Sequence, residues 1–130
     1  MARQAKLRGK IILLLEHNDD VRDFISEFLT RQGATVLARS TAKGALAAIP
    51  QHSPSVVLAD IGLPDRNGLK LLRDIRALGP QNGGDVPVLA ITAFSGIVGR
   101  TRVMSAGFQR QLEKPFQPAE LLEALKEVLS

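Results

Sequence analysis

Four short apolar segments of this sequence are each followed at once by polar residues that could do chemistry. They are Glu16-His17-Asn18-Asp19-Asp20 after Ile11–Leu15, Asp60 after Val56–Ala59, Thr92 after Val88–Ile91, and Lys114-Pro115 after Gln111–Leu112. Carboxylates that gather at one place repel one another unless a hard cation lies among them, and oxygen ligands of this kind suit Mg²⁺. A lysine and a hydroxyl suit the oxygens of a phosphoryl group bound to that metal. These residue types therefore indicate a combined metal and phosphate site.

The elements that must position these residues follow from the hydrophobic pattern. The four apolar segments and Thr35–Ala38 alternate with stretches of helical period, which is typical of βα units. Several segments are apolar without alternation, as strands buried on both faces of a parallel sheet require. We therefore predict a doubly wound α/β fold. In such a sheet, ligands bind beyond the carboxyl ends of the strands, where the polar residues stand.

The periodic stretches predict five helices. We expect a first helix after an Asp19 cap, others over Ala42–Ile49 and Leu69–Leu78, a weak one within Gly96–Ser105, and a last one opened by Pro118. In the first helix, Val21, Phe24, Ile25, Phe28 and Leu29 form the stripe expected to face the core.

Composition and charge narrow the function classes. The chain has 130 residues, 45% of them hydrophobic, and suits one domain with its own core. The absence of cysteine excludes disulfides and thiolate metal sites, and it fits a reducing compartment, so we expect a cytoplasmic protein. The apolar segment Ile11–Leu15 is too short to span a bilayer.

The positive charge is concentrated at the start of the chain. Arg3, Lys6, Arg8 and Lys10 account for the net charge of +4, and residues 11–130 carry equal numbers of acidic and basic side chains. We interpret residues 1–8 as a flexible basic leader and residues 9–130 as the folded domain. Neither nucleic acid nor a membrane is predicted as a partner.

Four motifs resemble those of the response-regulator receiver domain of two-component signalling. They are residues 11–20, residues 57–68 with Asp60, residues 90–93 with Thr92, and residues 113–116 with Lys114-Pro115. The resemblance extends from about Gly9 to Leu129, and the residues around Thr92 and Phe108 are most similar to those of receivers in hybrid histidine kinases. It implies a flavodoxin-like fold, a five-stranded parallel sheet of order 2-1-3-4-5 with helices on both faces.

The resemblance also implies roles for single residues. Asp60 would accept a phosphoryl group from a histidine kinase or a histidine phosphotransfer domain, in a signalling module that is not an enzyme. Glu16, Asp60 and the backbone carbonyl of Gly62 would hold Mg²⁺. Lys114 and Thr92 would bind phosphoryl oxygens, with the peptide bond before Pro115 cis. A downstream protein would bind the face formed by helix 4, strand 5 and helix 5, and the domain could form a homodimer.

Among the departures from the family pattern, two concern the metal site and the switch. His17 stands where the family usually has a second metal-binding carboxylate, and imidazole suits softer metals than Mg²⁺. We therefore predict weak Mg²⁺ binding and better binding of Mn²⁺ or another divalent ion. The alternative is that Asp19 or water completes the coordination and His17 points to solvent. Gln111 replaces the usual aromatic switch residue, so we expect coupling from Thr92 to the face of helix 4, strand 5 and helix 5 to be either weak or differently built.

Three functional hypotheses follow. The leading one is a phosphoaccepting receiver in phosphorelay signal transduction. The alternative is a receiver-like protein–protein interaction module with impaired or absent metal-dependent phosphorylation, for which His17 and Gln111 are the evidence. A phosphohydrolase with Asp60 as its nucleophile is disfavoured, because Gly62 stands where a second acid would protonate the leaving group.

Overall fold

The computed structural model describes residues 6–61, 67–93, 104 and 106–130. Its elements in chain order are β1 (Ile11–Leu15), α1 (Asp19–Arg31), β2 (Thr35–Arg39), α2 (Ala42–His52), β3 (Val56–Asp60), α3 (Asn67–Arg76), a 3₁₀ turn (Pro80–Asn82), β4 (Val88–Thr92), β5 (Arg110–Glu113) and α5 (Pro118–Leu129). Gly62 and almost all of the helix expected within Gly96–Ser105 lie outside the described residues.

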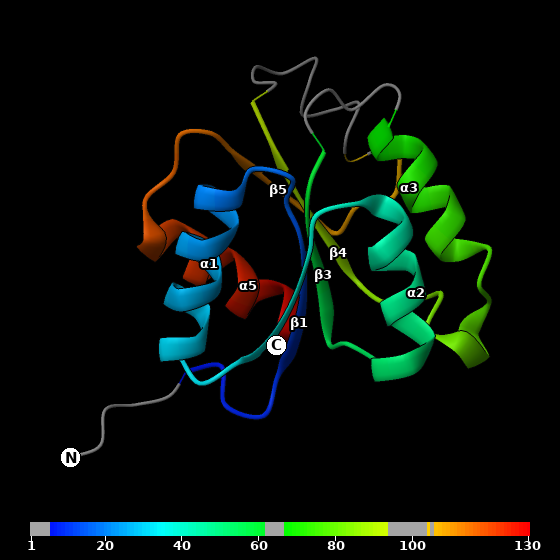
Figure 1. Ribbon diagram of the computed structural model, residues 1–130, viewed down its shortest axis with the longest axis horizontal. Coiled ribbons are helices and arrows are strands. Elements are labelled where there is room, and N and C mark those ends of the chain that lie inside the picture. Colours follow the sequence, from blue (N-terminus) through cyan, green and yellow to red (C-terminus); the bar gives the residue numbers. More distant parts are fainter. Residues whose placement is uncertain (1–5, 62–66, 94–103, 105) are drawn as a thin grey trace.

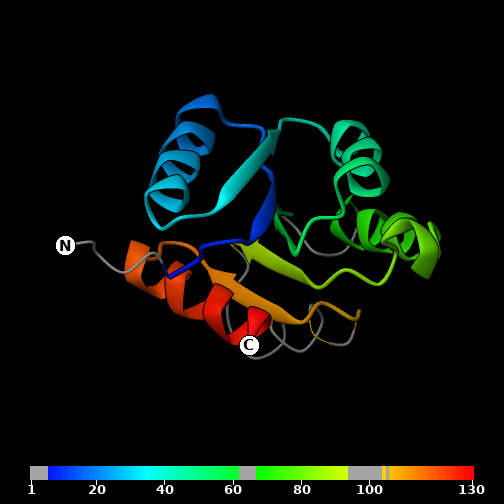
Figure 2. The same cartoon turned by 90° about the horizontal axis from the view of Figure 1, so that it is seen from below.

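All five strands form one parallel sheet in the order β2-β1-β3-β4-β5. Figure 1 shows α1 and α5 on one side of this sheet and α2 and α3 on the other, and the perpendicular view in Figure 2 agrees. The predicted doubly wound fold and its strand order are thus confirmed. Strand order reverses between β1 and β3, which is where such sheets bind ligands.

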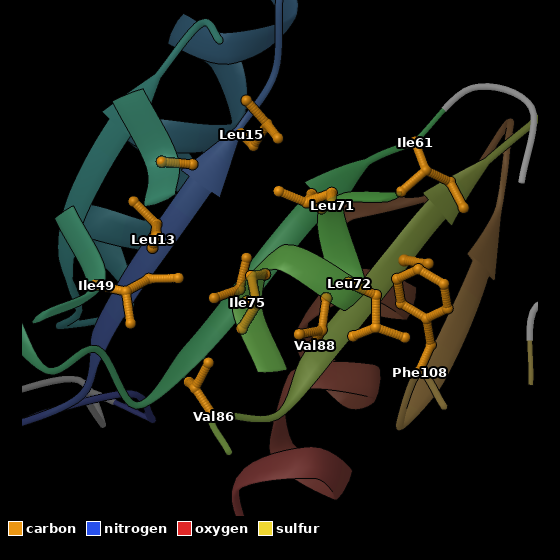
Figure 3. Packing of buried hydrophobic residues seen from close by; sticks show 14 of the residues in the cluster. Leu13, Leu15, Ile49, Ile61, Leu71, Leu72, Ile75, Val86, Val88 and Phe108 are labelled. Carbon is orange, nitrogen blue, oxygen red and sulfur yellow. The ribbon is translucent and has the colours of Figure 1, made fainter. Parts of the chain in front are cut away.

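The sheet separates two hydrophobic cores because successive strand residues point to opposite faces. Leu13, Val57, Val88 and Ala90 pack with α2 and α3, and Figure 3 shows part of this cluster, with Ile49, Leu71, Leu72 and Ile75 converging on the strands. The intervening residues, including Ile12, Leu14, Leu58 and Leu89, pack with α1 and α5. Burial on both faces explains why these strands read as continuous apolar segments.

Helix α1 differs from the prediction in two respects. Its N-cap is Asn18 rather than Asp19, with the Asn18 side chain accepting a hydrogen bond from the Val21 amide. Ile25 and Leu29 are buried as predicted, but Val21 is 37% and Phe24 59% exposed. At 100° per residue, Phe24 lies a quarter-turn from Ile25, and Val21 lies in the first turn, so the buried stripe is narrower than the apolar pattern suggests.

Residues 6–9 form a turn beside the carboxyl end of α1. Leu7 is 1% exposed and belongs to the core shared with α1 and α5, and its amide donates to the carbonyl of Gln32 at 2.8 Å. Packing against the domain thus begins within the segment that composition assigns to the leader. Among the described helices, none has the length and hydropathy needed to cross a membrane.

Candidate functional site

The residues singled out in the sequence lie at one edge of the sheet. The pairs Leu15 with Ala59, Asp60 with Ile91, and Thr92 with Glu113 are in register across β1, β3, β4 and β5. The ladder continues past the strand ends, since the Lys114 amide donates to the Thr92 carbonyl at 2.9 Å. Parallel strands therefore bring Glu16, Asp60, Thr92 and Lys114 to adjacent positions.

Asp60 is the buried centre of this edge. Its side chain is only 3% exposed, and its Oδ2 accepts a hydrogen bond from the Lys114 ammonium at 2.5 Å. Lys114 is 38% exposed, so the pair joins a buried carboxylate to an ammonium group that solvent reaches. The peptide bond between Lys114 and Pro115 is cis. A buried carboxylate with a cationic partner that can also bind a phosphoryl oxygen is suited to nucleophilic attack on phosphorus.

Glu16 lies beside Asp60 and is 2% exposed. Its Oε2 accepts from the Asn18 amide at 3.0 Å, while its buried Oε1 has no hydrogen-bond partner among the described residues. Burial chiefly raises the pKa of the Glu16 carboxyl, and the hydrogen bond with Asp60 and the charge of Asp60 raise it further. The Asn18 amide and the Lys114 charge oppose this shift. The two carboxylates of Glu16 and Asp60 thus share the single ammonium group that the described residues supply here, that of Lys114.

These carboxylates fit a divalent cation. The oxygen atom of Glu16 without a partner is the kind of donor that a hard metal ion requires, and a cation would relieve the repulsion that raises the pKa of Glu16. Within the described part of the chain, no three His, Cys, Asp or Glu side chains are grouped for metal binding. The backbone carbonyl of Gly62, which the resemblance implies as a ligand, lies outside the described residues.

His17 projects from the same turn into solvent. Its side chain is 83% exposed, and its Nδ1 lies 3.7 Å from Oε2 of Glu16. The alternative carboxylate, Asp19, is 82% exposed and hydrogen-bonded to Arg22 at 2.6 Å. The imidazole is therefore near the carboxylate pair, whereas Asp19 is engaged by a cation.

Thr92 and Gln111 lie on the face of the sheet that α2 and α3 cover. Ala90 packs on this face, Gln111 is in register with Ala90, and Thr92 is two residues further along the same strand. Thr92 is fully buried and Gln111 is 6% exposed. The side-chain amide of Gln111 donates to Oε2 of the half-buried Glu113 at 3.3 Å, so a polar pair stands where the family usually has an aromatic ring.

Sequence reasoning missed Arg22. This arginine donates from Nη1 to the Glu16 carbonyl oxygen at 2.8 Å and from Nη2 to Asp19. The three-residue spacing of Asp19 and Arg22 at the start of a helix is a signal that could have found the ion pair. The hydrogen bond to the Glu16 carbonyl has no such signal, because it depends on how the turn folds.

Comparison with known proteins decides the family. The model of the response regulator receiver domain matches residues 12–126. This chain belongs to the response regulator receiver family. Among curated receiver-containing relatives, the transcriptional regulatory protein GltR of Pseudomonas aeruginosa is 33% identical over 93% of this chain and 49% of its own length. The virulence transcriptional regulatory protein PhoP of Salmonella typhimurium is 30% identical over 91% of this chain and 51% of its own length. The chain thus spans about half of these regulators.

Solved receivers have the same fold. The receiver domain of a sensor histidine kinase from Pseudomonas aeruginosa, with magnesium coordinated in its active-site cleft, is 31% identical, with a TM-score of 0.79 over 93% of this chain and 98% of that one. The non-phosphorylated HemR receiver domain from Leptospira biflexa is 29% identical, with a TM-score of 0.79 over 94% and 95% of the two chains. The chemotaxis response regulator CheY4 of Vibrio cholerae, at 24% identity and a TM-score of 0.81 over 92% and 98%, supports the fold alone.

Proposed function

We propose that this receiver accepts a phosphoryl group on Asp60 from a histidine kinase or a histidine phosphotransfer domain. The observation that carries the proposal is the buried Asp60 carboxylate, which Lys114 contacts at 2.5 Å and Glu16 flanks at the carboxyl edge of the sheet. The domain would act as a signalling module within a phosphorelay and not as a classical enzyme. We assign residues 9–130 to the receiver and residues 1–8 to a basic leader, whose Leu7 packs into the core of the domain, in a cytoplasmic protein.

The reaction follows from the residues at this edge. An oxygen of Asp60 attacks the phosphorus of a phosphohistidine, a P–O bond forms, the P–N bond breaks and the imidazole leaves. Lys114 changes partner from the Asp60 carboxylate to a phosphoryl oxygen, and the Thr92 hydroxyl donates to another. Glu16 and Asp60 would hold Mg²⁺ with the Gly62 carbonyl, and the ion would neutralise negative charge at the acceptor.

We further propose that Mg²⁺ binds weakly and that Mn²⁺ or another divalent ion binds better. The exposed imidazole of His17 lies 3.7 Å from a Glu16 oxygen, where it could join the ligand set of a softer ion. Asp19 is held by Arg22 and is a poor replacement for the missing carboxylate.

Output would pass from Thr92 through β5. Phosphorylation adds charge that can reorder the neighbouring segments. We propose that the Gln111–Glu113 pair replaces the aromatic switch in this coupling, and that a downstream protein binds the face of helix 4, β5 and α5. Homodimerisation through the same domain is part of this proposal.

The second candidate is a receiver-like protein–protein interaction module without metal-dependent phosphorylation. The specific observation in its favour is the 83% exposed imidazole at the position where the family has a carboxylate.

Intact mass separates the two candidates. The protein is incubated with a small phosphodonor and either Mg²⁺ or Mn²⁺, beside Asp60→Ala and the family-like variant His17→Asp. One added phosphoryl group that is absent from Asp60→Ala supports phosphoacceptance. A larger yield with Mn²⁺ than with Mg²⁺, reversed in His17→Asp, supports the metal preference. No addition in the wild type with any ion, while His17→Asp is modified, favours the interaction module.

A further inference from the structure

Arg22 reaches from the first turns of α1 back to the turn that carries the metal-side residues. Its Nη1 donates to the Glu16 carbonyl oxygen at 2.8 Å, and its Nη2 donates to Oδ1 of Asp19 at 2.6 Å. The side chain is only 19% exposed. Arg31 on the same helix also forms an ion pair, with Glu27, but is 73% exposed. The two arginines therefore differ in burial and in what they hold.

The Glu16 carbonyl needs such a donor because the residue lies just beyond β1. The Glu16 amide still continues the sheet, donating to the carbonyl of Arg39 at 3.0 Å. The Glu16 carbonyl is instead held by the guanidinium of Arg22. The backbone of Glu16 is thereby fixed from both sides, by β2 through its amide and by α1 through its carbonyl.

Fixing this backbone matters because the Glu16 side chain is under electrostatic repulsion. Its carboxylate is buried beside that of Asp60, and its Oε2 accepts a hydrogen bond from the Asn18 amide of the same turn. A residue whose carboxylate is repelled by its neighbour stays in place only if its main chain cannot move away. His17 projects from the same turn, so Arg22 also holds the main chain that carries the imidazole.

We propose that Arg22 is a positioning residue, which holds the Glu16–Asn18 turn and thereby strengthens the binding of a divalent cation by Glu16 and Asp60. This inference rests on the proposed function and adds to it a residue that touches neither metal nor phosphate. A positioning role and the charge of Arg22 predict opposite effects of its removal on cation affinity. A guanidinium repels a divalent cation, so by Coulomb's law its removal would strengthen binding. A positioning role requires that removal weaken it.

The test is a calorimetric titration of the unphosphorylated protein with MnCl₂ and with MgCl₂. Arg22→Gln removes the charge and the forked donor, and we expect its affinity for Mn²⁺ to fall about three- to tenfold, as for the net loss of one hydrogen bond of ordinary strength that orders the site. Arg22→Lys keeps a charged donor for the Glu16 carbonyl and should recover part of the loss. Arg31→Gln is the matched control, since it removes the same charge from an ion pair on the same helix, and should change affinity by less than about twofold.

Circular dichroism first verifies that each variant is folded at the titration temperature. Should Arg22→Gln not fold, Arg22→Lys decides, with a two- to fivefold loss expected. Unchanged or stronger binding in the folded Arg22 variants overturns the inference, and so does an equal loss in Arg31→Gln. If the wild type binds neither ion, metal-dependent phosphorylation fails together with the inference. If the wild type binds Mn²⁺ and is phosphorylated on Asp60 but the Arg22 variants bind equally well, the inference alone fails.

Discussion

At the scale of single residues, the site formed by Glu16, Asp60 and Lys114 has more acidic than basic groups. Glu16 and Asp60 contribute two buried carboxyl groups, and Lys114 contributes one ammonium, at 2.5 Å from Asp60. The Lys114 charge lowers the pKa of Glu16, but burial and the neighbouring Asp60 outweigh it and the net shift is upward. The folded protein therefore stores unfavourable energy at neutral pH that a bound cation would release.

This imbalance predicts a pH-dependent cost in stability. Because the pKa of Glu16 is raised above its ordinary value of 4.5, the folded chain binds the Glu16 proton more tightly than the unfolded chain does. Stability from this group is therefore greatest at low pH and falls as pH rises from the ordinary pKa through the raised one. Glu16→Gln mimics the protonated acid and lacks this fall. Urea denaturation in EDTA from pH 4 to pH 8 should show the variant gaining on the wild type as pH rises.

The exposed Glu27, which pairs with Arg31 on α1, provides the control. Glu27→Gln should give a difference from the wild type with little dependence on pH above 5, because exposed ion pairs contribute little. A Glu16→Gln difference that is constant across the range would contradict the role assigned to the Glu16 charge.

At the scale of elements, the start of α3 packs against the chain just after Asp60. A Cβ built on Gly68 would lie 2.7 Å from Cβ of Ile61 and 3.1 Å from its Cδ1 and Cγ2 atoms. Ile61 is 7% exposed, and its amide donates to the Ile91 carbonyl at 3.0 Å, so it has little room to yield. Glycine is required at position 68 for this close approach.

Gly68→Ala should therefore strain the edge of the sheet that carries Asp60. We expect a loss of about 1–3 kcal/mol in the free energy of unfolding, as for overpacking of a core. We also expect a lower phosphorylated fraction, because Ile61 can move only by displacing its neighbour Asp60. Denaturation and intact mass measure the two effects.

Gly44→Ala in α2 is the matched control. The nearest neighbours of its new Cβ would be side-chain atoms of Thr41, with Oγ1 at 3.2 Å, and of Arg39. Alanine also favours the helix, so stability should change by less than about 1 kcal/mol. Equal effects of the two substitutions on phosphorylation would refute the contact argument.

At the scale of the whole molecule, the turn of residues 6–9 packs against the end of the domain opposite the site. Helix α1 runs back from the carboxyl edge, so the hydrogen bond between the Leu7 amide and the Gln32 carbonyl places Leu7 at the amino edge of the sheet (Figure 1). There Leu7 completes the core between α1, α5 and the sheet.

Leu7→Ala should lower the free energy of unfolding by about 2–5 kcal/mol, as for a leucine removed from a core. Arg8→Ala, at the exposed neighbouring position, should change it by no more than about 0.5 kcal/mol. Because the site lies at the other edge, the folded Leu7→Ala protein should be phosphorylated to the wild-type extent at a temperature well below its melting point. A Leu7→Ala protein as stable as Arg8→Ala would mean that Leu7 is not part of the core in solution.

Much of the fold and the site followed from local sequence. Continuous apolar segments specify strands buried on both faces, and helical periods between them specify crossovers, so a parallel sheet was predictable. Because parallel strands end at one edge, Glu16, Asp60, Thr92 and Lys114 could be placed together without coordinates. Their roles and the strand order came from the resemblance to receivers, and the order is the one observed.

The tertiary structure decided what depends on which side of an element is covered and on how a turn folds. The apolar stripe of α1 did not reveal that Phe24 stays exposed, since hydrophobicity does not say which neighbours are present. A charged leader did not reveal that Leu7 enters the core. The bond from Arg22 to the Glu16 carbonyl arises only when α1 and the end of β1 are both in place. The sequence by itself determined which groups meet at the edge of the sheet, and the packing of elements distant in the chain decided how they are held there.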